Sequence, residues 1–256
     1  MKKLVVIIFF ILISQSGFAQ LFTGEKILNN ENFDKDRFSY GYFLGFNNYG
    51  FDFEYNNQID DGTGRDVTDI QIEKGIGFSV GLLGNMRIND YFDLRFEPGL
   101  YITNRTLHYN QYHFAAYGAY NGYDFLTDSD NVLEREIKST YIHLPLLVKF
   151  SAKRINNFKP FIVGGMSMSL NLNSNEKNES DNHNGQFRMK KNTYYYEIGL
   201  GIDFYLEYFK FTPSIRGVFA LSDELVPDDP EEGASPWTDN IASMKTQGIF
   251  INFTFQ

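Results

Sequence analysis

Residues 193–221 read TYYYEIGLGIDFYLEYFKFTPSIRGVFAL, and this stretch decides the fold of the chain. From Tyr194 onward every second residue of the first half is aromatic or aliphatic, whereas the residues between them include Glu197 and Asp203. A period of two predicts a β-strand with two unlike faces. The alternation resumes after a tight turn, and the polar face of the second half carries Arg216. The stretch therefore predicts a hairpin of two long strands.

The two faces of this hairpin indicate a membrane-spanning barrel rather than a soluble sandwich. Each arm is longer than the roughly five to six residues of a common soluble strand. If protein covered both faces, the charges on the polar face would have to be buried. A barrel with lipid outside and a polar interior suits both faces, and the aromatic residues at the ends of the apolar face fit the girdles of such barrels.

Residues 1–19 have the form of a secretory signal peptide. Two lysines precede an unbroken apolar run, and small residues follow it. The run is too short for a helix that spans a bilayer, which argues against an uncleaved anchor. We predict cleavage between Ala19 and Gln20. A periplasmic N-terminal arm at 20–36 and an outer-membrane β-barrel domain at 37–256 would follow.

The composition narrows the class of protein. The chain has no cysteine, so neither disulfides nor thiolate metal sites are expected. The net charge is −9, and removal of the two lysines of the leader lowers it to −11, which argues against nucleic acid as a partner. Export, 17% aromatic residues and alternating strands together favour an outer-membrane barrel.

The rest of the chain continues the alternation, which gives eight predicted strands. Long and short connections alternate strictly between them, as in barrels with short periplasmic turns and long external loops. The predicted fold is all-β: an eight-stranded antiparallel up-and-down transmembrane β-barrel with both termini in the periplasm. Eight strands leave an interior filled by side chains, not a channel. The predicted strands begin at 38 and then cover 77–88, 92–105, 137–150, 158–172, the two arms of the hairpin and 245–255.

Two kinds of irregularity are expected within these strands. Residues 47–50 (NNYG) suggest a break or bulge in the first strand, which 51–55 then continue. Pro98, Pro145 and Pro213 lie inside predicted strands, where each removes a donor from the ladder. We expect bulges at these prolines, with a slip of the inward and outward faces beyond them.

The alternation also places a set of charged side chains inside the barrel. An unpaired charge there would be strongly destabilising, so we interpret the set as a structural network of paired charges. The alternative role, movement of protons or ions, conflicts with a filled eight-stranded interior. Arg216 and Glu197 lie on adjacent strands and are the best candidates for a pair. The predicted interior network consists of Arg95, Glu97, Lys149, Glu197, Asp203 and Arg216.

The histidines do not match a reactive site. His108 and His113 lie in an external loop with several aspartates, but their spacing fits no metal motif. His143 lies close to Ser139, and we interpret it as a polar residue of the interior rather than as the base of a membrane hydrolase. The sequence therefore predicts no catalytic residue, no cofactor and no metal site.

Seven stretches resemble the PorT family, which consists of outer-membrane β-barrel proteins of the Bacteroidota. The core YIHLPLLVKF is shared with a broad group of eight-stranded barrels, whereas the first two stretches and the last are similar to the narrower PorT type. The family has no catalytic residues to carry over. The stretches are FSYGYFLGFN (38–47), RFEPGLYIT (95–103), STYIHLPLLVKFSA (139–152), PFIVGGMSMSLNL (160–172), YEIGLGIDFYLEYFKFTPSIRG (196–217), GIFINFTF (248–255) and SPWT (235–238).

The resemblance implies a non-enzymatic component of the type IX protein secretion system, which exports adhesins and enzymes and supports gliding motility in some species. The alternative is a structural outer-membrane barrel that binds lipopolysaccharide, peptidoglycan or a surface ligand and is unrelated to secretion. The expected partners are outer-membrane lipid, lipopolysaccharide and other secretion proteins, with no nucleic acid among them.

Overall fold

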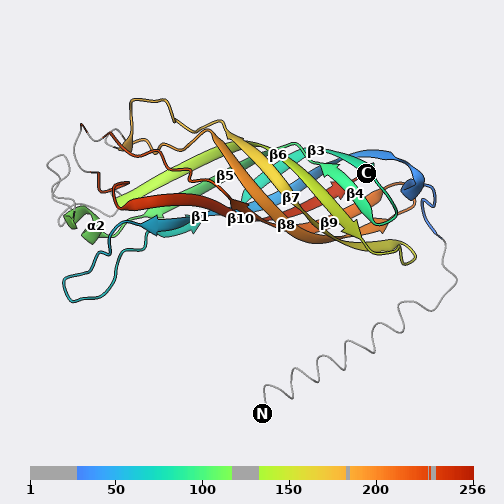
Figure 1. Ribbon diagram of the computed structural model, residues 1–256, viewed down its shortest axis with the longest axis horizontal. Helices are drawn as coiled ribbons and strands as arrows, with labels where there is room; N and C mark the ends of the chain where they lie inside the picture. Colours follow the sequence, from blue (N-terminus) through green and yellow to red (C-terminus); the bar gives the residue numbers. More distant parts are fainter. Residues whose placement is uncertain (1–27, 117–132, 183–184, 230, 232–234) are drawn as a thin grey trace, which may run out of the picture.

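The chain folds into antiparallel strands with almost no helix in a computed structural model, which describes residues 28–116, 133–182, 185–229, 231 and 235–256. The predicted signal peptide and its cleavage site, Ala19 and Gln20, lie outside these residues. A 3-10 helix, η1 (Phe33–Lys35), and an α-helix, α2 (Gln111–Ala116), lie at opposite ends (Figure 1). The strands are β1 (Phe38–Tyr55), β2 (Gln71–Lys74), β3 (Gly77–Arg87), β4 (Phe92–Phe96), β5 (Gly99–His108), β6 (Glu134–Ser151), β7 (Phe158–Asn171), β8 (Asn192–Tyr205), β9 (Lys210–Ala220) and β10 (Ile241–Phe255).

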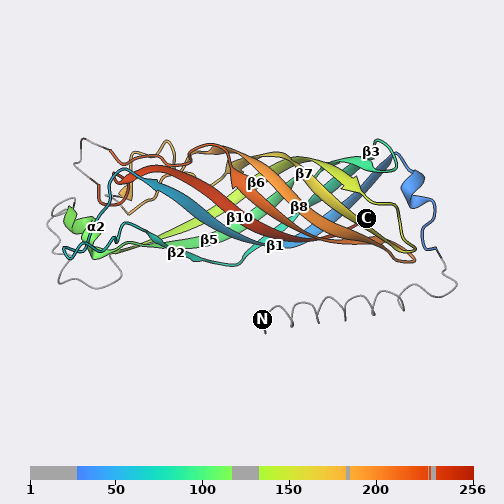
Figure 2. The same ribbon diagram turned by 60° about the horizontal axis from the view of Figure 1, so that its bottom comes forward.

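These strands close into a ring. β1 pairs with β10 on one side and with β3 on the other, so the first and last strands meet. β2 and β3 share one position in the ring, and β4 and β5 share another, because the chain is interrupted within each of these pairs. The described strands therefore fill eight positions, which confirms the predicted all-β up-and-down barrel (Figure 1, Figure 2). No helix in the described ranges is long and apolar enough to cross a membrane.

Short turns lie at one end of the barrel and long loops at the other (Figure 1). Gln256 lies at the short-turn end, where its backbone exchanges hydrogen bonds of 2.8 and 3.0 Å with Lys210. Asn29, near the start of the described chain, donates its side-chain amide to the carbonyl of Tyr205 at the same end. The turns are 88–91, 152–157 and 206–209, and the loops include 56–70, 172–191 and 221–240.

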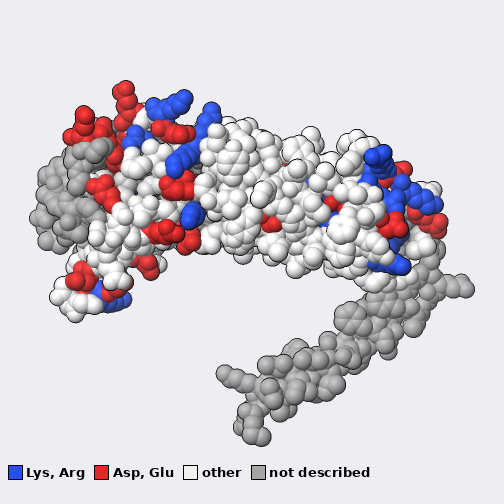
Figure 3. Space-filling model, in the orientation of Figure 1, with Lys and Arg blue, Asp and Glu red and all other residues white. Residues whose placement is uncertain are grey.

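Side chains alternate between the interior and the outer surface along each strand. In β8, Tyr194 and Leu200 are more than half exposed, whereas Glu197 is buried. Outward side chains are apolar through the middle of the molecule, which forms an uncharged band between charged ends (Figure 3). Large interior side chains fit because a glycine faces them: a Cβ on Gly199 would lie 2.5 Å from Cγ of Arg216.

The three prolines do not bulge the strands, so that prediction is wrong. Pairing partners keep one register on both sides of Pro98, Pro145 and Pro213. A proline lacks only its N–H, and its carbonyl still pairs: Pro98 accepts from Leu82 N at 2.9 Å and Pro145 from Glu97 N at 3.3 Å. The local cost is an interruption between β4 and β5, and the inward and outward faces do not slip.

β1 also runs without the predicted break at 47–50, because these residues stay in register opposite β10. An irregularity that the sequence did not suggest lies between β2 and β3. Lys74 of β2 pairs with Arg105, whereas Phe78 of β3 pairs with Ile102, which is a step of one residue. This bulge reverses which residues face inward. For this reason a search for strict alternation did not predict β2 as a strand.

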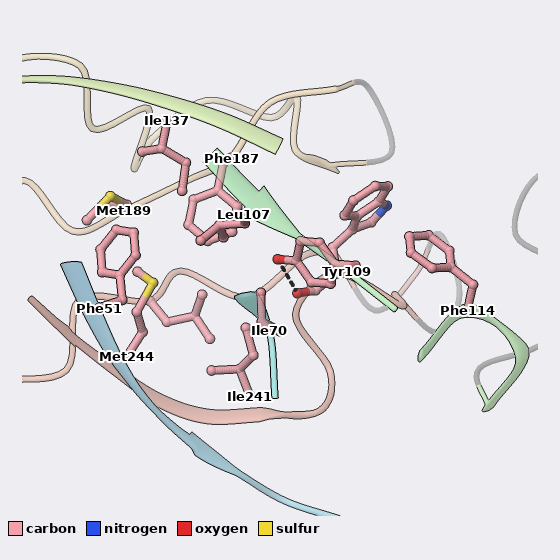
Figure 4. Packing of buried hydrophobic residues seen from close by; sticks show 12 residues of the cluster. Phe51, Ile70, Leu107, Tyr109, Phe114, Ile137, Phe187, Met189, Ile241 and Met244 are labelled. Carbon is pink, nitrogen blue, oxygen red and sulfur yellow. Dashed lines mark hydrogen bonds between the residues drawn. The ribbon is translucent and has the colours of Figure 1, made fainter. Parts of the chain in front are cut away.

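The strands extend beyond the apolar band at the long-loop end. β1 and β6 have 18 residues each, whereas about 9–11 residues of a tilted strand cross a bilayer. The extension encloses a hydrophobic core in which Phe51, Leu107 and Met244 of the strands pack with Phe187 and Met189 of a loop (Figure 4). The loops 172–191 and 221–240 therefore cover this end of the barrel and form its roof.

Candidate functional site

All six predicted interior charges lie inside the barrel, and none is more than 4% exposed. They separate into two clusters at different depths. In β8, Asp203 lies nearer the short-turn end than Glu197, and each belongs to a different cluster. The central cluster consists of Arg95, Glu97, Glu197 and Arg216; the turn-side cluster consists of Lys149 and Asp203, together with Lys210.

Arg216 is the bridge of the central cluster. Its Nη2 lies 3.0 Å from Oε2 of Glu97, and its Nη1 lies 3.2 Å from Oε2 of Glu197. Glu97 also pairs with Arg95, whose Nη2 lies 2.8 Å from its Oε1. Two cations and two carboxylates thus balance each other, and all four side chains are buried. The pair of Arg216 and Glu197, which the sequence suggested, is an ion pair in the structure, and Glu97 is a second partner that it did not suggest.

His143 extends the central cluster toward the long-loop end. Its Nε2 lies 2.7 Å from Oε1 of Glu197, and its Nδ1 lies 2.5 Å from Oγ of Ser169. Because a carboxylate only accepts, Nε2–H is the donor to Glu197. The ring packs edge-on against Tyr101 and Phe250, with centroid distances of 5.0 and 5.7 Å. Inward parity is the sequence signal that could have added His143 to the network, whereas its register opposite Ser169 appears only in the structure.

Ser169, His143 and Glu197 have the hydrogen-bond order of a serine hydrolase triad. Such a triad also needs an exposed nucleophile and room for the substrate beside it. Ser169 is 1% exposed and His143 is fully buried under aromatic rings. The arrangement therefore serves to hold the side chains of β6, β7 and β8 together, not to bring a serine to a substrate.

The turn-side cluster centres on Asp203. Lys149 donates to its Oδ2, and the Thr212 hydroxyl donates to its Oδ1 at 2.8 Å. Lys149 also lies over the ring of Phe161, 4.2 Å from its centroid. Lys210, which faces inward from the start of β9, is a further cation of this cluster. Its parity with Arg216 is the signal by which the sequence could have included it.

The described part of the N-terminal arm closes the interior at the short-turn end. Phe33 of η1 lies under the barrel, where Nζ of Lys210 is 4.4 Å from its ring centroid. The Tyr205 hydroxyl donates to Oδ1 of Asp34 at 2.7 Å. Arg154 of a short turn donates to the carbonyl of Asn29 and lies over the ring of Tyr205. The arm is therefore a cap that is fixed by several elements.

Glu224 closes the interior at the long-loop end. The side chain is fully buried in the extension, beyond the apolar band, and accepts from the Thr246 hydroxyl at 2.9 Å. Its backbone N donates to the carbonyl of Met244 at 2.8 Å, so the loop is held against β10. Burial raises the pKa of the Glu224 carboxyl to about 7, although the nearby Arg105 acts in the opposite direction. No alternation covers this loop, so Glu224 could not be predicted from the sequence pattern.

The motif SPWT at 235–238 belongs to the roof. Ser235, Trp237 and Thr238 are all buried. The guanidinium of Arg135 lies 3.5 Å from the centroid of the Trp237 ring, and the Tyr109 hydroxyl donates to the Trp237 carbonyl at 3.1 Å. This motif therefore stabilises the loops rather than exposing a recognition surface.

The described residues contain no group of three or more histidine, aspartate or glutamate side chains placed to hold a metal ion. His108 lies between two carboxylates, 3.3 Å from Glu73 and 3.0 Å from Glu134, and ties β5 to its neighbours β2 and β6. His183 lies outside the described residues, and the side chain of His113 is not described.

The chain belongs to the outer membrane protein beta-barrel domain family, whose model matches residues 18–226. It is an outer-membrane β-barrel protein. Its fold is similar to the outer membrane protein OprG from Pseudomonas aeruginosa, with 12% identity, a TM-score of 0.42 and coverage of 84% of this chain and 95% of the other. For Neisserial surface protein A the values are 9%, 0.42, 86% and 98%, and for Ail of Yersinia pestis with a heparin analogue they are 12%, 0.36, 84% and 96%. No curated protein sequence matches the chain.

The central cluster predicts that loss of two partners is tolerated better than loss of one. Arg216→Met leaves two buried carboxylates without their shared cation, at a cost of roughly 3–5 kcal/mol. Adding Glu197→Gln should restore part of this stability, because Glu97 keeps Arg95 as its partner. The temperature at which the folded band converts to the unfolded band on gels measures the effect. Arg65→Met, in an exposed loop, is the control, and a double variant no more stable than Arg216→Met would contradict the pairing.

The raised pKa of Glu224 predicts that the stability of the roof depends on pH. Its folded pKa lies above its ordinary value, so the folded state takes up a proton as the pH falls through about 7. Insertion of the loop should therefore be more stable at about pH 5 than at about pH 9. Hydrogen exchange of the Glu224 amide, corrected for intrinsic rates, should be more protected at the lower pH. Glu224→Gln should remove this difference, and a difference that persists in the variant would exclude Glu224 as its source.

Proposed function

We propose that this barrel is a non-enzymatic component of the type IX secretion system and acts through its two ends rather than through a pore. The observation that carries the proposal is the filled interior. Two charge clusters and a layer of aromatic side chains, which includes Tyr49, Tyr101, Tyr141 and Phe250, occupy the space between the caps. A folded or unfolded cargo protein cannot pass such a core, so contacts with partner proteins must lie on the outside.

The resemblance to the PorT family supports the secretion role. The stretches that carry it lie on strands of the wall and in the roof, and they include both Glu197 and Arg216. Their roles here are packing and ion pairing, which fits a family without catalytic residues. The partners on this proposal are other secretion proteins, together with the surrounding lipid and lipopolysaccharide.

One observation favours the alternative, a structural barrel that binds lipopolysaccharide, peptidoglycan or a surface ligand. Outward lysines lie just beyond the apolar band at the long-loop end. Lys138 lies 2.9 Å from Glu136, and Lys245 lies 3.4 Å from Glu54. Lysines at such a boundary suit the phosphates of an outer-leaflet lipid.

The proposal includes an orientation in which the short-turn end and both termini face the periplasm. Native cysteines are lacking, so single cysteines report this orientation directly. Gln58→Cys in the loop 56–70 should react with an impermeant maleimide in intact cells, because it is exposed at the long-loop end. Glu207→Cys, exposed in the turn 206–209, should react only after permeabilisation. The reverse pattern would invert the orientation.

A clean gene deletion tests the secretion role. Type IX cargo should be lost from the medium and the cell surface, and expression of the wild-type chain should restore it. Restoration by the Arg216→Met variant and by its double variant with Glu197→Gln should follow the amount of folded barrel. Normal cargo secretion together with an altered envelope would reject the proposal and favour the alternative. A variant that folds at the wild-type level but fails to restore secretion would show that the interior charges act in the mechanism.

A further inference from the structure

A hollow of about 690 Å³ lies on the outer surface of the barrel wall formed by β6 to β10. Its lining is made of aliphatic side chains, two phenylalanines and glycines. Arg216 is the only charged residue in the lining, and its side chain is buried in the interior, so it contributes main chain to the floor. The hollow is therefore an apolar groove in the lipid-facing wall, and neither charge cluster opens into it.

The groove follows one row of residues across five strands. Val148, Gly164, Ile198, Gly217 and Ile249 pair directly with one another in that order. One glycine thus lies on each side of Ile198. At the corresponding positions, the neighbouring rows carry larger side chains. The groove exists because this row lacks two side chains.

The fold does not require a glycine at 164. A Cβ there would meet only the carbonyl of Glu197, at 3.4 Å, which is an ordinary contact. Inward glycines differ: a Cβ on the adjacent Gly165 would lie 2.2 Å from the carbonyl of Leu146. At Gly217 a Cβ would lie 2.9 Å from the ring of Phe219, a side chain that would have to move, and 3.8 Å from the carbonyl of Ile198, an ordinary contact. The two glycines of this row therefore shape the outer surface, and the packing of the barrel interior does not require them.

The width of the groove selects its occupant. Side chains on one face of a strand repeat at about 6.8 Å, so the side chains missing at Gly164 and Gly217 leave a gap about as wide as a single alkyl chain on each side of Ile198. A transmembrane helix with its side chains is about 10 Å across and is too wide. The lining offers no polar side chain for a headgroup. We propose that the groove binds one acyl chain of an outer-membrane lipid, a role independent of the proposed secretion function.

The test uses the full mature chain in lipid nanodiscs that contain a phospholipid with a diazirine in its acyl chain. After irradiation, mass spectrometry locates the labelled residues. Label should concentrate several-fold on β8 around Ile198 relative to outward residues of β3, such as Val80 and Leu82, which face the same bilayer. Even labelling around the barrel would overturn the proposal.

Substitutions separate a specific site from general lipid contact. Gly164→Leu should fill the groove and lower the label at Ile198 several-fold, and Gly164→Ala, whose methyl has room, should lower it less. Gly84→Leu is the matched control, because Gly84 is also outward and open, with its nearest contact at 4.0 Å, but does not line the groove. Unchanged label in Gly164→Leu, or an equal fall in Gly84→Leu, would overturn the site.

A native-membrane experiment tests the occupant itself. A photoreactive amino acid at position 198 should give lipid adducts and no crosslink to another protein. A protein crosslink at this position would identify a protein, not an acyl chain, as the occupant of the groove and would overturn the proposal. Folding of every variant is checked by the heat-dependent shift on gels, and the wild-type label pattern remains a test even if a variant does not fold.

Discussion

The bridge from Arg216 to Glu97 and Glu197 is the contact on which the rest of the barrel depends. A ring of eight strand positions is too narrow to hydrate charges at its centre, so every interior charge needs a partner of opposite sign. The bridge links the β4 side of the ring to β8 and β9. A slip of one residue would turn Arg216 toward lipid. The ion pairs thus specify the register that the hydrogen-bond ladder alone would leave open.

The same requirement explains the caps. Lys210 and Glu224 lie near the two ends of the interior, where strand pairing supplies no further cover. Phe33 lies under Lys210 at one end, and a loop inserts Glu224 against β10 at the other. The arm and the loop therefore complete the fold and do not merely connect it. Any contact with a partner must act on these caps, on the roof or on the outer wall.

Alternation along the strands predicted the barrel and the inward position of all six network residues. It could not predict their depth, because a period of two says which face a side chain takes but not which neighbours share its level. For this reason the partnership of Arg216 with Glu97 appeared only with the strand register. The loops lack any period, so Glu224 gave no signal. The expectation of bulges at the three prolines was wrong. Each proline lacks only its N–H, and the strands keep their register on both sides of it.

The wall behind the central cluster combines two opposite needs. Gly199 faces inward to admit Arg216, and Gly164 and Gly217 face outward and leave the groove. Glycine in a strand interior costs roughly 0.5–1 kcal/mol relative to alanine, so this part of the wall is intrinsically weak. The salt bridge of Arg216 with Glu97 and the hydrogen bond of His143 with Glu197 offset this weakness, because they hold β8 and β9 to side chains that reach across the interior from Glu97 and from β6. The central cluster thus stabilises the same part of the wall that the inward Gly199 and the outward Gly164 and Gly217 weaken.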